Sequence, residues 1–106
     1  MAVIASQKAE NYKHIILNNG KHDSVGGQPT VGYKIDIQQI AKGCGYKNVY
    51  LAENEEELEA AVKELDSCCG PALLEVRVKG GARKDLGRPT TTPVENKTAL
   101  MKFLSK

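Results

Sequence analysis

Residues 17–30 read LNNGKHDSVGGQPT, a stretch that turns from apolar to polar at its second position. The preceding Ile15 and Ile16 form, with Leu17, a run of residues that favour β-strands. A strand-forming run that stops at an Asn-Asn-Gly step indicates the C-terminal end of a strand. Because ligands bind at this end of the strands in open α/β sheets, residues 18–30 are a candidate ligand loop.

Two interpretations of this loop stay open when only its residues are considered. Gly26 and Gly27 give the backbone freedom, and exposed N–H groups in such a turn can hold an anion. Asn19 adds a neutral carboxamide oxygen, which Mg²⁺ accepts readily as a ligand. The Asn-Gly step is also a signal for a β-hairpin turn, and polar loops rich in glycine are common. The residues alone therefore allow either a ligand loop or a simple hairpin.

The rest of the chain predicts alternating strands and helices. Strands are expected at residues 14–18, 48–52 and 72–79. Three helices are expected after capping residues that are followed three positions later by Gln or Glu, namely Asp36 with Gln39, Asn54 with Glu57, and Thr92 with Glu95. Gly45 and the Gly70-Pro71 pair end the first two. Apolar residues at helical spacing give each helix one apolar face: Ile37, Ile40, Ala41 and Cys44, then Leu58, Ala61, Val62 and Leu65, then Val94, Leu100, Met101 and Leu104.

This order of elements predicts an α/β fold. Crossover connections between strands of one sheet are right-handed and join parallel strands. We therefore expect residues 1–106 to form a single domain with a three-layer α/β/α arrangement around a parallel sheet. Parallel strands also place the loop after residues 72–79 at the same edge as Asn19.

The composition narrows the class of protein. A chain of 106 residues with 41% apolar content suits one small core. A net charge of +2 and 5% aromatic residues argue against a nucleic-acid-binding protein. No membrane association is expected, because no apolar run approaches the length of a membrane helix. The 3 cysteines have the spacing of neither a disulfide framework nor a zinc site, which favours a cytoplasmic location.

Residues 80–92 read GGARKDLGRPTTT and form a basic loop. Its guanidinium groups, on Arg83 and Arg88, match the geometry of phosphate or phosphonate oxygens. A basic loop that only faces solvent is the alternative interpretation.

Two long segments, LNNGKHDSVGGQPT and GARKDLGRPTTTPVENK, resemble parts of a known family. The first is similar to the second half of the thiamine diphosphate signature, in which Gly-Asp-Gly is followed further along by Asn-Asn. Together the segments resemble the thiamine diphosphate-dependent 2-oxo acid decarboxylases, phosphonopyruvate decarboxylase in particular. Sulfopyruvate decarboxylase is a close relative of that enzyme. The resemblance runs from Asn11 onward and implies a partial thiamine diphosphate-binding fold.

The resemblance implies roles for several residues. The side-chain oxygen of Asn19 and the main-chain carbonyl of Lys21 would bind Mg²⁺. The residues that would contact the thiamine diphosphate cofactor are Asn18, Asn19, Gly20, Lys21, Gly26 and Gly27. The substrate implied by the resemblance is 3-phosphonopyruvate, which the reaction converts to phosphonoacetaldehyde and CO₂. His22 is the candidate for proton transfer because it lies within the cofactor loop. Arg83 and Arg88 are the candidates for binding the anionic group, because they follow the third strand and a guanidinium suits a tetrahedral anion.

One departure from the family pattern is important. No Gly-Asp-Gly precedes Asn19, so the chain is expected to be the C-terminal part of a larger enzyme and to be inactive alone. The expected partners are a small 2-oxo acid and either a second copy or the missing N-terminal part. A subunit of a two-gene enzyme, a sulfopyruvate decarboxylase and a non-catalytic interaction module that keeps only the fold remain alternatives.

Overall fold

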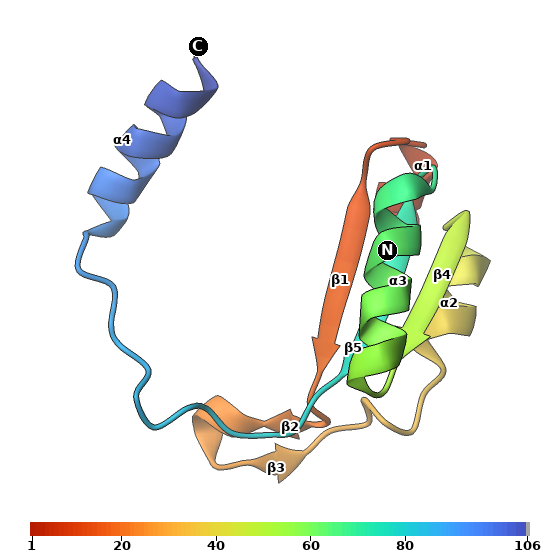
Figure 1. Cartoon of the computed structure of the whole chain (residues 1–106), viewed down its shortest axis with the longest axis horizontal. Helices are drawn as coiled ribbons and strands as arrows, with labels where there is room; N and C mark the ends of the chain where they lie inside the picture. Colours follow the sequence, from red (N-terminus) through yellow and green to blue (C-terminus); the bar gives the residue numbers. More distant parts are fainter. Residues whose placement is uncertain (106) are drawn as a thin grey trace.

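The computed structural model describes residues 1–105, and a sheet of three parallel strands forms its centre (Figure 1). The strands of this sheet are β1 (Lys13–Asn18), β4 (Asn48–Ala52) and β5 (Ala72–Arg77). The helices are α1 (Ala2–Ser6), α2 (Ile37–Cys44), α3 (Glu55–Ser67) and α4 (Pro93–Leu104). A small excursion after β1 contains β2 (Lys21–His22), the 3₁₀ turn η1 (Asp23–Val25) and β3 (Gln28–Pro29).

The strand order is β1-β5-β4, so the last strand of the sequence lies in the middle. Leu74 of β5 lies between Ile15 of β1 and Tyr50 of β4 in the register. A central parallel strand is covered on both faces, which explains the unbroken apolar run at the start of β5. The parallel order was expected from the sequence, and β5 is two residues shorter than expected because pairing ends at Arg77.

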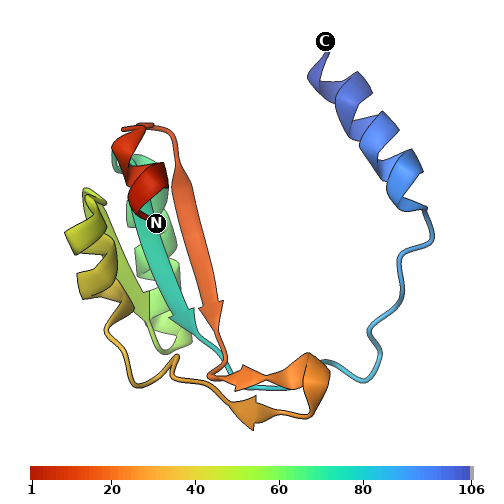
Figure 2. The ribbon, with the colours of Figure 1, turned by 180° about the vertical axis from the view of Figure 1, so that it is seen from behind.

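Helices cover both faces of the sheet, which confirms the predicted three-layer α/β/α arrangement (Figures 1 and 2). On one face α3 buries Ala61 and Leu65 against Leu74 and other residues of β4 and β5. On the opposite face α1 and α2 cover a second core around Leu73 and Tyr46. Burial raises the pKa of the Tyr46 phenol above its ordinary value.

The predicted caps are present. Asp36 accepts the backbone N–H of Gln39 at the start of α2, and Gly45 ends that helix at a φ of 102°. Asn54 accepts the N–H of Glu57 at the start of α3. The carboxylate of Glu57 accepts the N–H of Glu53 rather than that of the cap itself. These local signals therefore set the beginnings of both helices.

Some apolar positions expected to face the core lie at the surface. Ile40 of α2 is 46% exposed and Val62 of α3 is 45% exposed. On the outer strand β1, Ile15 and Leu17 are also exposed, since α3 covers β4 and β5 and does not extend over β1.

The C-terminal helix α4 stands apart from the sheet in both views (Figures 1 and 2). Its capping box at Thr92 and Glu95 is complete, as the sequence predicts. None of its residues is buried, however. The apolar face predicted for α4 therefore contacts no other element within the described part of the chain. No helix within residues 1–105 is long and apolar enough to cross a membrane.

Candidate functional site

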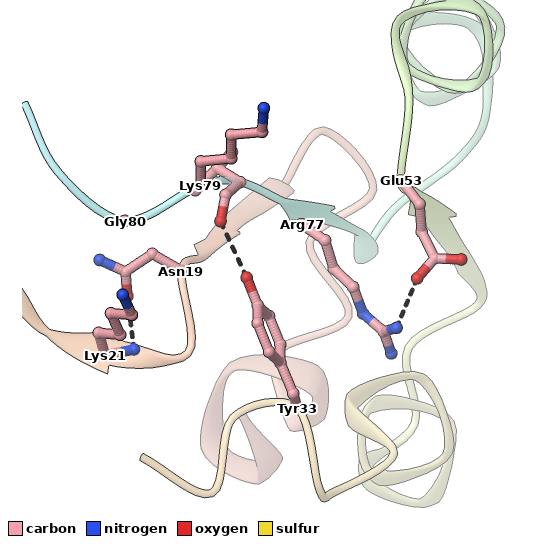
Figure 3. Close-up of a pocket in the computed structure, with 8 residues that line it drawn as sticks. Asn19, Lys21, Tyr33, Glu53, Arg77, Lys79 and Gly80 are labelled. Atoms are coloured by element: carbon pink, nitrogen blue, oxygen red, sulfur yellow. Dashed lines mark hydrogen bonds and ion pairs between the residues drawn. The ribbon is translucent and has the colours of Figure 1, made fainter. Parts of the chain in front are cut away.

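An open cavity of about 630 Å³ lies at the C-terminal edge of the parallel strands (Figure 3). It is formed where β1, β4 and β5 end and the segments that follow them meet. The residues that line it are Asn19, Lys21, Tyr33, Glu53, Arg77, Val78, Lys79 and Gly80. The candidate ligand loop and the end of β5 therefore contribute to one cavity, as the parallel order predicts.

The turn after β1 presents Asn19 beside this cavity. The Asn19 Oδ1 atom accepts the N–H of Lys21 at 3.1 Å, and Asn19 Nδ2 donates to Asp23 Oδ2 at 2.9 Å. Asp23 Oδ2 also accepts the N–H of Gly81 at 2.7 Å. Asp23 therefore connects the turn after β1 to the segment that follows β5.

Asn18 is buried, and its side chain forms hydrogen bonds with different partners from those of Asn19. Its Nδ2 donates to the carbonyl of Gly32 at 2.8 Å and to Glu75 Oε1 at 2.7 Å. Its Oδ1 accepts the N–H of Gly20 at 3.0 Å. The carboxamide of Asn18 thus forms all its hydrogen bonds within the protein, and its bond to the Gly20 N–H stabilises the turn.

Tyr33 holds the turn from the other side. Its hydroxyl donates to the carbonyl of Val78 at 2.8 Å and lies 3.2 Å from the carbonyl of Asn18 (Figure 3). Its ring lies so close to Gly20 that an added Cβ would be 2.7 Å from the ring. Gly20 also has a φ of +64°, so both its backbone conformation and its neighbour require glycine.

Arg77 is the central cation of the cavity and is already paired. Its Nη1 lies 2.5 Å from Glu53 Oε1, and its guanidinium carbon lies 5.7 Å from the centroid of the Tyr33 ring. Its buried Nε lies 3.7 Å from Glu75 Oε1, an ion pair too long for a hydrogen bond. Lys21 and Lys79 are the cations of the lining that remain exposed.

The turn offers a divalent cation two neutral oxygen ligands. Asn19 Oδ1 accepts one hydrogen bond and retains a second lone pair. Lys21 faces Pro29 beside the pair in which the Thr30 N–H donates to the Gly20 carbonyl at 2.8 Å, so it occupies a non-hydrogen-bonded position and its carbonyl points away from the partner strand. Such oxygens suit Mg²⁺, which keeps several ligands from water or phosphate. No group of three or more His, Cys, Asp or Glu side chains that could hold a metal occurs among residues 1–105, so these two oxygens form only part of a coordination shell.

Comparison with known families identifies the fold to which this edge belongs. Residues 1–76 match the family described as thiamine pyrophosphate enzyme, C-terminal TPP binding domain. The chain belongs to this family. The match covers the whole three-stranded sheet with the exception of Arg77, the last residue of β5.

The relatives of this TPP-binding domain agree with the resemblance seen in the sequence. The chain is 34% identical over 95 residues to phosphonopyruvate decarboxylase from Streptomyces viridochromogenes and 35% identical over 95 residues to that from Streptomyces hygroscopicus. Both matches cover 90% of this chain and 24% of the relative. A sulfopyruvate decarboxylase subunit beta from Methanocaldococcus jannaschii is 32% identical over 68 residues, covering 60% of this chain and 36% of the relative. The chain therefore spans about a quarter of the length of the phosphonopyruvate decarboxylases that it matches.

The TPP-binding domain does not place all the predicted site residues at the cavity. His22 is exposed on β2, where it pairs with Gln28, and it is not part of the cavity lining. Gly26 and Gly27 lie at the far end of the β2–β3 hairpin, with φ values of 110° and 73°. The ligand loop is thus also a hairpin, and the roles of these three residues remain predictions.

Arg83 and Arg88 are not among the residues that line the cavity. Both are exposed in the segment between β5 and α4. Arg83 Nε lies 3.5 Å from Asp85 Oδ1. Their role in substrate binding therefore remains a prediction as well.

Six residues of the lining were not among the predicted site residues, and four of these have polar or charged side chains, namely Tyr33, Glu53, Arg77 and Lys79. Three of them follow or end a strand at the same sheet edge as Asn19, so strand ends were the signal that could have found them. Tyr33 had no such signal, because it belongs to the irregular segment between β3 and α2.

Proposed function

We propose that this chain carries the Mg²⁺-binding and diphosphate-facing part of a decarboxylase that acts on 3-phosphonopyruvate. In this reaction the carboxylate leaves as CO₂, a proton takes its place on the carbonyl carbon, and phosphonoacetaldehyde results. The observation that carries the proposal is the 34–35% identity over 95 residues to two phosphonopyruvate decarboxylases, which includes the turn at the cavity.

The chain's own residues would bind and orient the cofactor. Asn19 Oδ1 and the carbonyl of Lys21 would hold Mg²⁺ beside the diphosphate, and the exposed ammonium of Lys21 adds a positive charge to the same turn. When bound, thiamine diphosphate supplies the electron sink for loss of CO₂. Asn18, Gly20 and Tyr33 keep the turn in the shape that these contacts require.

Two sets of cations compete for the phosphonate group of the substrate. Arg83 and Arg88 have the better geometry for a tetrahedral anion, whereas Lys21 and Lys79 already line the cavity. We keep the arginines as the primary proposal, because the segment that carries them begins at the cavity with Gly80.

A sulfopyruvate decarboxylase is the second candidate. It is favoured by the 32% identity to a sulfopyruvate decarboxylase subunit beta, a protein whose name also indicates a divided enzyme. The sulfonate of that substrate carries one negative charge where a phosphonate carries up to two, so fewer cations would be needed.

A chimaeric enzyme tests the proposal. This chain replaces the matching C-terminal segment of the Streptomyces hygroscopicus enzyme, and CO₂ release is measured with 3-phosphonopyruvate and with sulfopyruvate. We expect turnover of the phosphonate substrate, and a loss of tenfold or more in kcat/KM for Asn19→Ala, which is about 1.4 kcal/mol or more. Asn11→Ala is the matched control, because Asn11 is exposed and distant from the cavity lining.

The same chimaera separates the two sets of cations. Arg83→Lys or Arg88→Lys should lower kcat/KM by about tenfold if the arginines bind the phosphonate. A loss confined to Lys21→Gln and Lys79→Gln would assign the anion to the cavity lining. A chimaera that is folded and binds thiamine diphosphate, yet turns over neither substrate, would refute the proposed activity.

The remaining expectations about the whole protein are proposals too. We propose that the chain functions in association with a second copy or with a further polypeptide segment, supported by the exposed apolar residues of β1 and α4. The cytoplasmic location stays a prediction from the cysteine pattern.

A further inference from the structure

Glu75 is a carboxylate buried in the middle of the sheet. It lies in the central strand β5 between Leu74 and Val76, and only 1% of its surface is exposed. Burying an ionised carboxylate is costly unless donors surround it, and apolar side chains in such positions often give equal or greater stability. Stability alone therefore does not account for a glutamate at this position.

The contacts of Glu75 are all with hydrogen-bond donors. Glu75 Oε1 accepts from Asn18 Nδ2 at 2.7 Å, and its Oε2 accepts from Gln38 Nε2. The Nε of Arg77 lies 3.7 Å from Oε1. The carboxylate thus joins the end of β1, the first turn of α2 and the end of β5.

The direction of these bonds fixes the carboxamide of Asn18. An ionised carboxylate only accepts hydrogen bonds, so Glu75 requires the Nδ2 side of the carboxamide, as does the Gly32 carbonyl. The Oδ1 side is then forced toward the N–H of Gly20, which it accepts at 3.0 Å. If the carboxamide were reversed, its oxygen would oppose Glu75 and its amino group would oppose the Gly20 N–H.

We propose that Glu75 is a positioning residue for the turn from Asn19 to Lys21. By fixing Asn18, it holds the Gly20 N–H and so orders the two oxygens assigned to the metal before any cation arrives. The network itself is independent of the proposed function, and only the identity of the metal rests on it. Preorganisation of this kind improves binding, because the turn does not have to be ordered during it.

Amide hydrogen exchange in the Glu75→Met variant of this chain tests the proposal. Methionine has a similar length but no strong acceptor, so the Asn18 amino group loses the carboxylate and keeps only the Gly32 carbonyl. We expect the Gly20 amide to exchange about tenfold faster relative to the Leu58 amide, a reference in α3 bonded to the carbonyl of Asn54. Equal slowing or equal acceleration at both amides would show a merely structural role and overturn the proposal.

The paired variant Glu75→Gln with Gln38→Glu is the rescue. It exchanges donor and acceptor, so that the glutamine introduced on β5 can accept from Asn18 while donating to the new carboxylate on α2. We expect Gly20 protection to return close to that of the original protein. The proposal would also be wrong if the Gly20 amide lost its protection in the single variant and did not regain it in the paired variant. An acceptor that faces Asn18 would then not be the cause of that protection.

Two measurements on the unaltered chain keep the proposal testable if a variant does not fold. Both Nδ2 hydrogens of Asn18 should exchange at least about tenfold more slowly than those of the exposed Asn11. Equal rates would refute the network. Addition of Mg²⁺ with thiamine diphosphate should shift the resonances of Asn19 and Lys21. If they do not shift, the metal assignment fails, while the exchange data still decide the role of Glu75.

Discussion

Gly20 illustrates how one residue sets the geometry of the candidate site. Its φ of +64° lies in the left-handed region, and the Tyr33 ring occupies the space where a side chain would begin. The ring has little freedom to move, because its hydroxyl is bonded to the carbonyl of Val78 and lies near that of Asn18. The turn that presents Asn19 therefore depends on the absence of a side chain at its centre.

We expect Gly20→Ala to lower the free energy of unfolding by at least about 1–2 kcal/mol, the cost of a left-handed backbone for an L-residue before any steric cost. Chemical denaturation followed by circular dichroism measures it. Gly43→Ala is the matched control, since an added Cβ there meets no atom within 4 Å. That change lies inside helix α2 and should raise stability by about 0.5–1 kcal/mol. Equal effects of the two changes would contradict this account of Gly20.

Helix α4 keeps its start through its own side chains, because it has no contact with the sheet. The carboxylate of Glu95 accepts the Thr92 N–H at 2.7 Å and the Thr92 hydroxyl at 2.8 Å. The backbone hydrogen bond and then the side-chain hydrogen bond of Thr92 lower the pKa of Glu95 below its ordinary value of 4.5. This contribution to helix formation is complete above pH 4.5 and disappears as pH falls through the lowered pKa.

Acidification should therefore unwind the first turn of α4. Backbone ¹³C chemical shifts of residues 93–96, recorded from about pH 7 to about pH 2, measure its helix content. Glu95→Gln is the control, because glutamine keeps an acceptor oxygen but does not titrate. Loss of helix with the same pH dependence in the control would mean that another group is responsible.

The sequence predicted the elements better than their contacts, for a physical reason. Caps at Asp36, Asn54 and Thr92 act over three or four residues, so short-range patterns reveal them. The central place of β5, the exposure of Ile40 and the position of Arg88 depend on which segments meet in space. Local periodicity carries no information on that.

The candidate site shows the same division. Asn19 and Lys21 were found because they lie in one continuous motif, and Arg77 was missed because its significance comes from Glu53, Glu75 and Tyr33 around it. The hairpin formed by β2 and β3 confirms the hairpin interpretation of the loop, and its Lys21 also lines the cavity, whereas ligand binding by the loop stays a prediction.

The sheet has two edge strands, β1 and β4, and the flank at β1 carries exposed apolar side chains. In the sheet order, β1 pairs only with β5, and its Ile15 and Leu17 side chains are 52% and 69% exposed. Across from this flank, α4 exposes a second set of apolar side chains: Val94, Leu100, Met101, Phe103 and Leu104. Free strand edges and apolar patches of this kind favour association with another polypeptide.

We expect the isolated chain to self-associate, and sedimentation over a wide concentration range measures this. Leu17→Lys should shift the distribution toward monomer, because a charge on an edge strand opposes pairing. Val25→Lys is the matched control, since Val25 is 66% exposed but lies in the hairpin rather than the sheet. A monomer at all concentrations would show that the flank needs no partner.

The isolated chain should bind thiamine diphosphate with Mg²⁺ only weakly. The described residues offer two neutral oxygen ligands, and Mg²⁺ requires six oxygens in an octahedral shell. Titration calorimetry should give a dissociation constant weaker than about 1 μM, equivalent to about −8 kcal/mol. A dissociation constant at or below that value would mean that the chain, or its self-associated form, completes the coordination shell.

The segment between β5 and α4 has one further consequence. Residues 82–92 contain no helix or strand and follow Gly81, whose N–H is bonded to Asp23, so they join the folded part to a helix with no contacts of its own. A short flexible tether holds its cargo at an effective concentration on the order of millimolar around its attachment point. For any surface of the same chain that α4 can reach, the local concentration of α4 therefore does not change when the protein is diluted.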